Sequence, residues 1–304
     1  MTMPYLPPAV LPPTLWKNER YHVARHLQAA YEQELTARNL IDLAKSNAKK
    51  HVFGGASLED TNAHFALRFF ASVVRVQNVI LDTKSAFGKI PSDLLETFSS
   101  HKISMLDIPC GTGAGALGVL SVVHELRLAG ILPTLPIHVK ILAADVSPHA
   151  IEIYRDQLEH VRTALKTTAI ALELTTREWD AADLLSTHDL CEEWLRTVDE
   201  VNESLVLVTN FSGAGNLMFD KFKESWRHIS VRTASKNATM LWVEPGDPGG
   251  KTFLKNLSAI IRSLFRINHD EDHEPPFSEA KWWHSLNEQE FAIRSSVLHY
   301  TRPQ

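Results

Sequence analysis

Glycines and carboxylates that could hold a nucleotide-like ligand gather in one short segment, 106–115, which reads LDIPCGTGAG. An apolar run ends in Asp107, and glycines follow at Gly111, Gly113 and Gly115. Glycine lets a ligand approach the backbone and tolerates positive φ, and a following helix offers free N–H groups and a positive dipole end. The segment therefore predicts a ligand site beyond the carboxyl end of a parallel strand.

Two classes of cofactor fit these glycines. Gly113, Gly115 and Gly118 match the G-x-G-x-x-G fingerprint of dinucleotide-binding folds, a pattern that is weak on its own. In those folds the glycines follow the strand directly, and an acid about 20 residues further on binds the ribose. Here the strand ends in Asp107 before the glycines, and the next strand-end acid, Asp145, lies further away than that spacing. The context therefore disfavours a nicotinamide cofactor.

The elements that must position this segment alternate from residue 102 onward. Apolar β-type runs at 103–108, 138–145, 169–175, 204–210 and 238–244 are each followed by a helical run, at 114–129, 148–166, 189–199, 217–233 and 250–265. Five strand–helix units in succession predict a doubly wound parallel sheet. Two further strands, 281–286 and 291–301, flank a short polar turn and predict a closing antiparallel hairpin. The expected fold is α/β, with a seven-stranded, mostly parallel sheet.

The first hundred residues have a different pattern. Five prolines between positions 4 and 13 favour an extended arm, which is expected to lie on the chain's own core or on a second subunit in a homodimer. Helical periodicity follows over 18–50, after Ser57 and over 92–99, and Ser57 with Asp60 predicts an approximate capping box. We expect residues 1–100 to form an arm and a helical subdomain over the carboxyl edge, and residues 101–304 to form the cofactor-binding domain.

In this context the sequence resembles the class I S-adenosylmethionine-dependent methyltransferases. LDIPCGTG is similar to their first motif, an acid followed by spaced glycines at the end of the first strand. AADVSPHAIEIYRDQL resembles the second motif, WDAADLL the third, and LVLVTNFSG the fourth. The closing hairpin agrees as well, since that family ends its sheet with an antiparallel strand. The resemblance extends over about 102–302 and implies S-adenosylmethionine as the cofactor.

The first motif implies roles at the methionine end of the cofactor. Asp107 would orient the amino group through water, and Gly111 and Gly113 would pass beneath the methionine moiety. Pro109, which we include among the cofactor-binding residues, departs from the family because it replaces the first glycine, removes one N–H and fixes φ.

The second and third motifs imply roles at the adenosine end. Asp145 would accept both ribose hydroxyls, which one carboxylate can do, and Val146 would pack on the adenine. Asp180, with Ala181 beside it, would take the adenine amino group. Asp183 is the alternative, because the register of WDAAD is ambiguous by three residues.

The fourth motif implies that Asn210 and Phe211 flank the methyl donor. It reads TNFS rather than the Asn/Asp-Pro-Pro-Tyr/Phe of amino-directed nucleic-acid methyltransferases, which disfavours methylation of adenine N6 in DNA.

The fifth strand ends in the acidic turn EPGDPGG, a candidate wall of the substrate site. No catalytic residue is identified, and four groups stay open as a general base: His64, His22, His26 and Glu244.

Several other clusters are interpreted as structural. HDEDHE at 269–274 could bind a divalent metal, but a solvated loop before two prolines is favoured and no metal site is expected. Trp282 and Trp283 are expected to pack on opposite sides of a strand. Cys110 is interpreted as a small filler in the cofactor turn. Three lysines, Lys45, Lys49 and Lys50, are explained by a helix end.

Composition excludes further classes of protein. The chain has 304 residues, a net charge of −5, 44% hydrophobic and 22% charged residues, which is typical of a soluble globular protein. Two cysteines are too few for a disulfide framework, and neither an apolar run of about 18 residues nor a secretory signal is found. We expect a cytoplasmic protein with no membrane partner.

The function predicted from these patterns is methyl transfer from S-adenosylmethionine. A small-molecule acceptor is slightly favoured over RNA. The first alternative is a non-catalytic subunit that keeps the cofactor fold as a scaffold. A less favoured alternative is an NAD(P)-dependent oxidoreductase that uses the fingerprint glycines.

Overall fold

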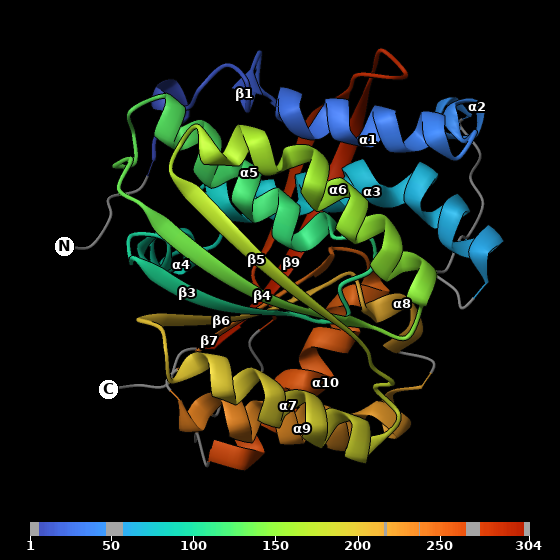
Figure 1. The fold of residues 1–304 in the computed structure, drawn as a ribbon, viewed down its shortest axis with the longest axis vertical. Helices are drawn as coiled ribbons and strands as arrows, with labels where there is room; N and C mark the ends of the chain where they lie inside the picture. The colour runs from blue at the N-terminus through green and yellow to red at the C-terminus, as the bar shows by residue number, and fades with distance from the viewer. Residues whose placement is uncertain (1–5, 47–56, 216–217, 237, 266–273, 301–304) are drawn as a thin grey trace.

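The computed structural model describes residues 6–46, 57–215, 218–236, 238–265 and 274–300, which form a mixed α/β fold around one sheet (Figure 1). Its nine strands pair in the order β1-β2-β8-β9-β7-β6-β3-β4-β5. The strands are β1 Trp16–Lys17, β2 Arg20–His22, β3 Lys102–Asp107, β4 Ile137–Asp145, β5 Ile170–Glu178, β6 Glu203–Thr209, β7 Thr239–Pro245, β8 Phe277–His284 and β9 Gln289–Tyr300. The helices are α1 Arg25–Ala37, α2 Ile41–Lys45, α3 Leu58–Leu81, α4 Ile90–Thr97, α5 Ala114–Leu128, α6 Pro148–Lys166, α7 Leu184–Val198, α8 Ser212–Gly215, α9 Phe219–Ser235 and α10 Pro248–Phe265.

Five neighbouring strands, in the order β5-β4-β3-β6-β7, are parallel, which confirms the predicted doubly wound sheet. The chain moves outward from β3 to β5 and then returns to the other side of β3 to start β6. The connecting helices therefore cover opposite faces, α5 and α6 on one and α7 and α9 on the other (Figure 1). Such sheets bind ligands at the point where the strand order reverses, between β3 and β6.

The closing hairpin is also confirmed, because β9 pairs antiparallel with both β7 and β8. Its first strand begins at Phe277, earlier than the expected start at 281. Ser278, Ala280 and Trp282 are buried on one side of β8, and exposed residues alternate with them. The small and polar side chains at the start of the strand hide this alternation from a search for apolar residues.

The expected number of seven strands is wrong, because two short strands near the N-terminus extend the sheet to nine. β1 and β2 form a tight hairpin, and β2 pairs in parallel with β8. Part of this hairpin lies where helical periodicity was expected, and α1 begins only at Arg25. Strands of two or three residues are too short to show a period, and the free edge of β8 supplies backbone partners that the local sequence does not reveal.

Each face of the sheet has its own hydrophobic core. Along β6, Leu205 and Leu207 point into the cluster under α1, α3, α5 and α6, whereas Val206 and Val208 point into the cluster under α7, α9 and α10. Alternation with period two on a strand that is buried on both sides produces this division. The helix boundaries follow local signals as well: α6 occupies the predicted range, and α7 begins at Leu184 because Asp183 caps it.

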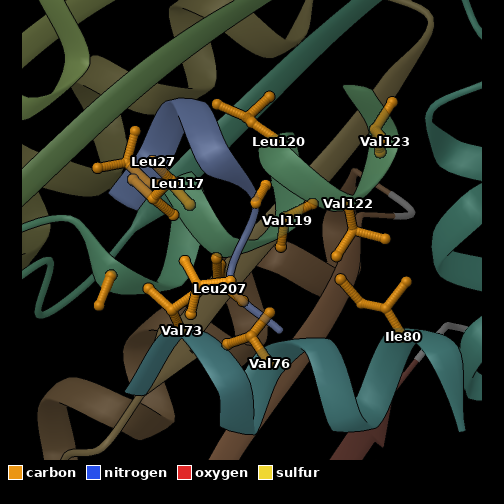
Figure 2. Packing of buried hydrophobic residues seen from close by; sticks show 14 of the residues in the cluster. Leu27, Val73, Val76, Ile80, Leu117, Val119, Leu120, Val122, Val123 and Leu207 are labelled. Carbon is orange, nitrogen blue, oxygen red and sulfur yellow. The ribbon is translucent and has the colours of Figure 1, made fainter. Parts of the chain in front are cut away.

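Helix α3 is the main element that the first hundred residues add to the sheet. Ser57 accepts a hydrogen bond from the Asp60 N–H at 3.1 Å, which confirms it as the cap of α3, and the Asp60 carboxylate accepts the Ser57 hydroxyl at 2.7 Å rather than the Ser57 N–H of a full capping box. Figure 2 shows Val76 and Ile80 of α3 facing α5, with Val119 on the α5 side. The N-terminal helices therefore share one core with the sheet.

The proline-containing arm lies on the chain's own core where the structure describes it. Leu11 and Leu15 are buried in the same cluster as α3 and α5. This favours the first of the two expectations for the arm, whereas a homodimer through it stays a prediction, as does the division into domains at residue 100. None of the helices in the described ranges is both long and apolar enough to cross a bilayer.

Candidate functional site at the carboxyl edge of the sheet

The predicted cofactor residues meet where β3, β4 and β6 end. Asp107 is the last residue of β3 and lies opposite Ala143 on β4 and Leu207 on β6. The turn after β3 is fastened to the end of β4, because the Gly111 N–H donates to Asp145 Oδ2 at 2.8 Å. The structure therefore brings the first and second motifs into direct contact.

Asp107 is fully buried, and neither of its carboxylate oxygens forms a hydrogen bond with the described residues. Burial raises the pKa of this carboxyl group well above its usual range, and the nearby Asp145 raises it further. The hydroxyl of Tyr154 and the N–H of Ala116 lie close enough to lower the Asp107 pKa in part, without the geometry of a hydrogen bond. A buried carboxyl group without a partner is rare in proteins and calls for an explanation.

Two of the turn glycines have positive φ, but only one of them faces open space. Gly111 has φ of 50°, and a Cβ built on it would meet no atom within 4 Å. Gly113, at the start of α5, has φ of 86°, and a Cβ there would lie 2.3 Å from the ring of Tyr154. Gly111 is therefore the glycine with room for a ligand, whereas Tyr154 fills the space over Gly113.

The other two fingerprint glycines face the protein interior. A Cβ on Gly115 would lie 2.9 Å from the Thr209 hydroxyl, and a Cβ on Gly118 would lie 3.4 Å from the backbone of Val73 on α3. In dinucleotide folds the second glycine lets the backbone approach a pyrophosphate. Here close packing of α5 against β6 and α3 accounts for both residues, which removes the main support for a nicotinamide cofactor.

Pro109 and Cys110 complete the turn. The Ile108–Pro109 peptide bond is cis, and Pro109 is partly exposed. Cys110 is buried, and its N–H donates to Ala144 O at 2.9 Å. Burial raises the pKa of the Cys110 thiol well above its usual range. A thiol that stays protonated is a poor nucleophile, which agrees with the interpretation of Cys110 as a filler.

Asp145 ends β4 with a carboxylate that already accepts two backbone hydrogen bonds. Besides Gly111, the Ser147 N–H donates to Asp145 Oδ1 at 2.9 Å. Burial raises the Asp145 pKa in spite of these donors. A carboxylate offers about four acceptor positions, so capacity for further hydroxyl donors remains. The next residue, Val146, is 57% exposed, which leaves an apolar side chain uncovered beside the carboxylate.

The third motif lies beside the end of β4, because the Trp179 N–H donates to Asp145 O at 3.0 Å. Asp180 and Asp183 are both exposed, whereas the side chain of Ala181 is buried in the core. Asp183 caps α7 by accepting the Leu185 N–H at 2.9 Å. Helix capping therefore accounts for Asp183, whereas the Asp180 carboxylate, among the described residues, accepts only the local Ala182 N–H, at 2.8 Å.

The fourth motif places its two residues on opposite sides of the turn after β6. Asn210 has φ of 57°, and its side-chain oxygen accepts a hydrogen bond from Arg75 of α3. Phe211 is buried among aromatic rings, 5.1 Å from Phe222 and 5.3 Å from Trp226 between centroids. Asn210 thus faces α3, whereas the side chain of Phe211 packs in the core beneath the turn.

Glu244, at the end of β7, holds this turn in place. Its fully buried carboxylate accepts the Phe211 N–H at 2.9 Å and the Ser212 N–H at 3.0 Å. Burial raises the Glu244 pKa to about 7, although the two N–H donors and the positive charge of Arg75 lower it in part. The acidic turn expected to wall the substrate site therefore starts with a buried carboxyl group whose pKa lies close to neutral pH.

The four candidate bases separate into two groups. His64 belongs to α3 and is partly exposed, and burial together with the charges of Arg68 and Arg75 lowers its pKa to about 4. With Glu244 it lies near the carboxyl edge. His22 belongs to β2, next to the last strand at one side of the sheet, and His26 bonds Ser121 in the third turn of α5. The last two lie away from the strand ends.

Sequence reasoning missed two residues of this site, Tyr154 and Arg75. Both lie on helices whose patterns predict only packing, and their contacts join segments far apart in the chain. The sequence did mark Arg75 as unusual, because a single cation interrupts the apolar run VVRVQNVI of α3.

The HDEDHE cluster lies outside the described residues except for Glu274, and Lys49 and Lys50 also lie outside them. Figure 1 places α8, which follows Asn210, at the same edge.

Two tryptophans on β8 are packed rather than available to a ligand. Trp282 is buried against Phe291, with ring centroids 5.8 Å apart. On the other side of the strand, the guanidinium of Arg20 lies over the ring of Trp283, 5.6 Å from its centroid. The expected division of the two rings between the faces of the strand is confirmed.

Comparisons with known proteins give a distant likeness to solved structures. No family model matches the chain, and no curated protein matches it in sequence. A solved structure from Listeria monocytogenes, provisionally assigned to the class I S-adenosylmethionine-dependent methyltransferases, is similar at 14% sequence identity and covers 98% of this chain and 89% of its own. The TM-score is 0.34, so the superposition is poor and we draw no functional conclusion from it.

Proposed function

We propose that this chain binds S-adenosylmethionine at the carboxyl edge of β3 and β4 and transfers its methyl group. The observation that carries the proposal is the buried carboxyl group of Asp107 without a hydrogen-bond partner. Leaving such a group unsatisfied costs about 1–3 kcal/mol. A ligand ammonium, reached directly or through water, would remove that cost, and the methionine part of the cofactor carries one. The open space over Gly111 suits the same part.

The remaining cofactor assignments follow from charge and exposure at the strand ends. Asp145 keeps acceptor positions for the ribose hydroxyls, and the exposed side chain of Val146 offers an apolar surface to the adenine. We choose Asp180 over Asp183 for the adenine amino group, because Asp183 already caps α7. Ala181 can contribute only its backbone, since its side chain is buried.

In the proposed reaction an acceptor atom attacks the methyl carbon while the carbon–sulfur bond breaks, and the electron pair leaves with S-adenosylhomocysteine. The protein's part is to align these three atoms and to exclude water. Asn210, held by Arg75, would border the methyl group from the α3 side. A general base is needed only if the acceptor must lose a proton, and His64 and Glu244 are the groups at this edge that could take one.

A small-molecule acceptor fits the position of α3. This helix is fastened along the strand ends by Thr61, which bonds Ser147 at 3.1 Å, and by Arg75, which bonds Asn210. An edge crossed by a helix in this way suits a small molecule better than a structured RNA, as does the net charge of −5.

A second candidate function, a non-catalytic scaffold, is favoured by the position of Tyr154. Its ring fills the space over Gly113, where the cofactor's methionine part would otherwise pass. If the chain is such a scaffold, the glycines and acids of the turn after β3 have only a structural role in its packing.

Calorimetry on the full chain would separate these candidates. We expect S-adenosylmethionine and S-adenosylhomocysteine to bind with micromolar dissociation constants and NAD(P) not to bind. Binding of NAD(P) alone would refute the proposal, and binding of none of them would favour the scaffold. Transfer of a radiolabelled methyl group to the small-molecule or RNA fraction of a cell extract would then identify the acceptor class.

A further inference from the structure

Three metal-ligating side chains meet between α1 and α5, away from the proposed cofactor edge. His26 of α1 faces His124 and Glu125 of α5, and one potential ligand atom from each lies within 4.8 Å of the other two. His26 Nδ1 lies 3.5 Å from Glu125 Oε1. The side chains of His26 and Glu125 are only 12% and 8% exposed, and His124 is 4% exposed.

Hydroxyl groups fix the orientation of all three side chains. The Nε2 atom of His26 pairs with the Ser121 hydroxyl at 3.0 Å, and Nδ1 of His124 pairs with the Thr168 hydroxyl at 2.8 Å. Each imidazole thereby has one nitrogen engaged and the other left for a ligand. Histidines that bind metals characteristically use the second ring nitrogen in this way, which sets the tautomer and the ring angle.

The carboxylate is oriented by the N-terminal arm. The Thr14 hydroxyl donates to Glu125 Oε2 at 2.5 Å, which leaves Oε1 directed toward His26. The set therefore joins three segments that are distant in the chain: the arm, α1 and α5. A bound ion would fasten the arm and α1 onto the helix that follows the cofactor turn.

We propose that His26, His124 and Glu125 form a binding site for a divalent transition-metal ion such as Zn²⁺. Two imidazoles and one carboxylate are a ligand set that Zn²⁺ takes, with water in the fourth position. Zinc–ligand bonds of about 2.0–2.1 Å in a tetrahedron place the ligand atoms about 3.3 Å apart. The His26–Glu125 separation of 3.5 Å is near that value, whereas the potential ligand atom of His124, within 4.8 Å of the other two, would have to move closer when the ion binds.

The proposed ion serves the fold rather than the proposed methyl transfer. His124 and Glu125 lie about 15 Å along α5 from its first residue, Ala114, at 1.5 Å per residue. The site is therefore independent of the cofactor assignment, and either can fail without the other. Because the ion binds only the folded arrangement, it raises the stability of the chain.

Cobalt titration of the full chain, prepared without a histidine tag and stripped with chelator, tests this site. We expect one equivalent of Co²⁺ to give the visible absorption of a four-coordinate site, and Zn²⁺ to displace it and raise Tm by several degrees. His26→Gln and His124→Gln should each weaken binding at least tenfold. Glu125→Gln keeps the shape of the side chain and remains informative if a histidine variant fails to fold.

The control is the double variant His269→Gln/His273→Gln, which removes the other histidine–carboxylate cluster in the sequence. It should bind Co²⁺ as the unsubstituted chain does. The proposal is overturned if the folded chain gives neither cobalt absorption nor a zinc-dependent rise in Tm. It is equally overturned if the control abolishes binding while Glu125→Gln leaves it unchanged. In either case the three side chains form only a cluster held by hydrogen bonds and by the His26–Glu125 ion pair.

Discussion

Replacing Asp145 by asparagine separates the two tasks that this carboxylate performs. In the free protein Asp145 accepts the N–H groups of Gly111 and Ser147, one on each oxygen. Asparagine retains one oxygen and places an NH₂ group against the second N–H donor. The substitution therefore removes one charge-assisted hydrogen bond and weakens the other.

The expected size of the effect follows from those two bonds. A hydrogen bond to a charged group contributes about 1.5–3 kcal/mol, and a buried donor without a partner costs about 1–3 kcal/mol. Because one of these bonds is lost and the other weakened, we expect Asp145→Asn to lower the free energy of unfolding by about 2–3 kcal/mol. Loss of the ribose contact should separately weaken cofactor binding by about 1–3 kcal/mol, roughly five- to 150-fold.

Two measurements distinguish these effects. Urea unfolding at pH 7 reports stability, and calorimetry with S-adenosylhomocysteine at a temperature where the variant stays folded reports binding. Asp183→Asn is the matched control, since Asp183 also accepts a backbone N–H after a strand but does so as a helix cap. It should leave both stability and affinity nearly unchanged, because asparagine caps a helix about as well as aspartate. Equal affinities for Asp145→Asn and the unsubstituted chain would refute the ribose assignment.

Three further predictions follow from the described contacts. Burial raises the Asp107 pKa, and an ammonium ligand needs the ionised form, so S-adenosylmethionine affinity should rise with pH; a calorimetric pH series in which Asp107→Asn keeps the same slope would contradict this. Gly115→Ala places a Cβ 2.9 Å from Thr209, which should cost about 1–3 kcal/mol of unfolding free energy; an unchanged urea midpoint would show that α5 yields freely. Leu15→Ala removes a fully buried side chain of the arm and should cost about 2–5 kcal/mol; a loss under 1 kcal/mol in urea unfolding would mean that the arm contributes little to the core.

Local signals account for the parts of the fold that the sequence predicts well. The range of α6 follows from Ser147 as its cap and Pro148 at its first turn, and the start of α3 follows from the cap at Ser57. The parallel sheet follows from the alternation of strand and helix runs. For the two helices the decisive interactions join residues that are near one another in the chain, and for the sheet the alternation of strand and helix runs is itself a local pattern, so both are visible without the structure.

Long-range contacts explain what the sequence did not predict. The β1–β2 hairpin exists because β2 pairs with the edge of β8, and the carboxyl group of Asp107 is approached by Tyr154 of α6. Likewise, Arg75 and Asn210 are distant in the chain and meet only because α3 crosses the sheet. The motifs predicted which residues gather at the carboxyl edge. They did not predict which of these residues are covered by protein and which face open space.

The parallel pairing of β2 with β8 has a consequence for the order in which the chain can assemble during synthesis. Tyr21 lies beside Trp282 in the sheet, and Asn78 of α3 bonds Ser295 of β9 at 2.9 Å. Both partners are translated more than 200 residues after Tyr21 and Asn78, so β2 cannot pair with β8 until that later part of the chain has emerged from the ribosome. Contacts of such sequence separation slow folding. A nascent chain halted before residue 277 should therefore hold α3 over an incomplete sheet and leave β2 paired with β1 but without β8 on its other side.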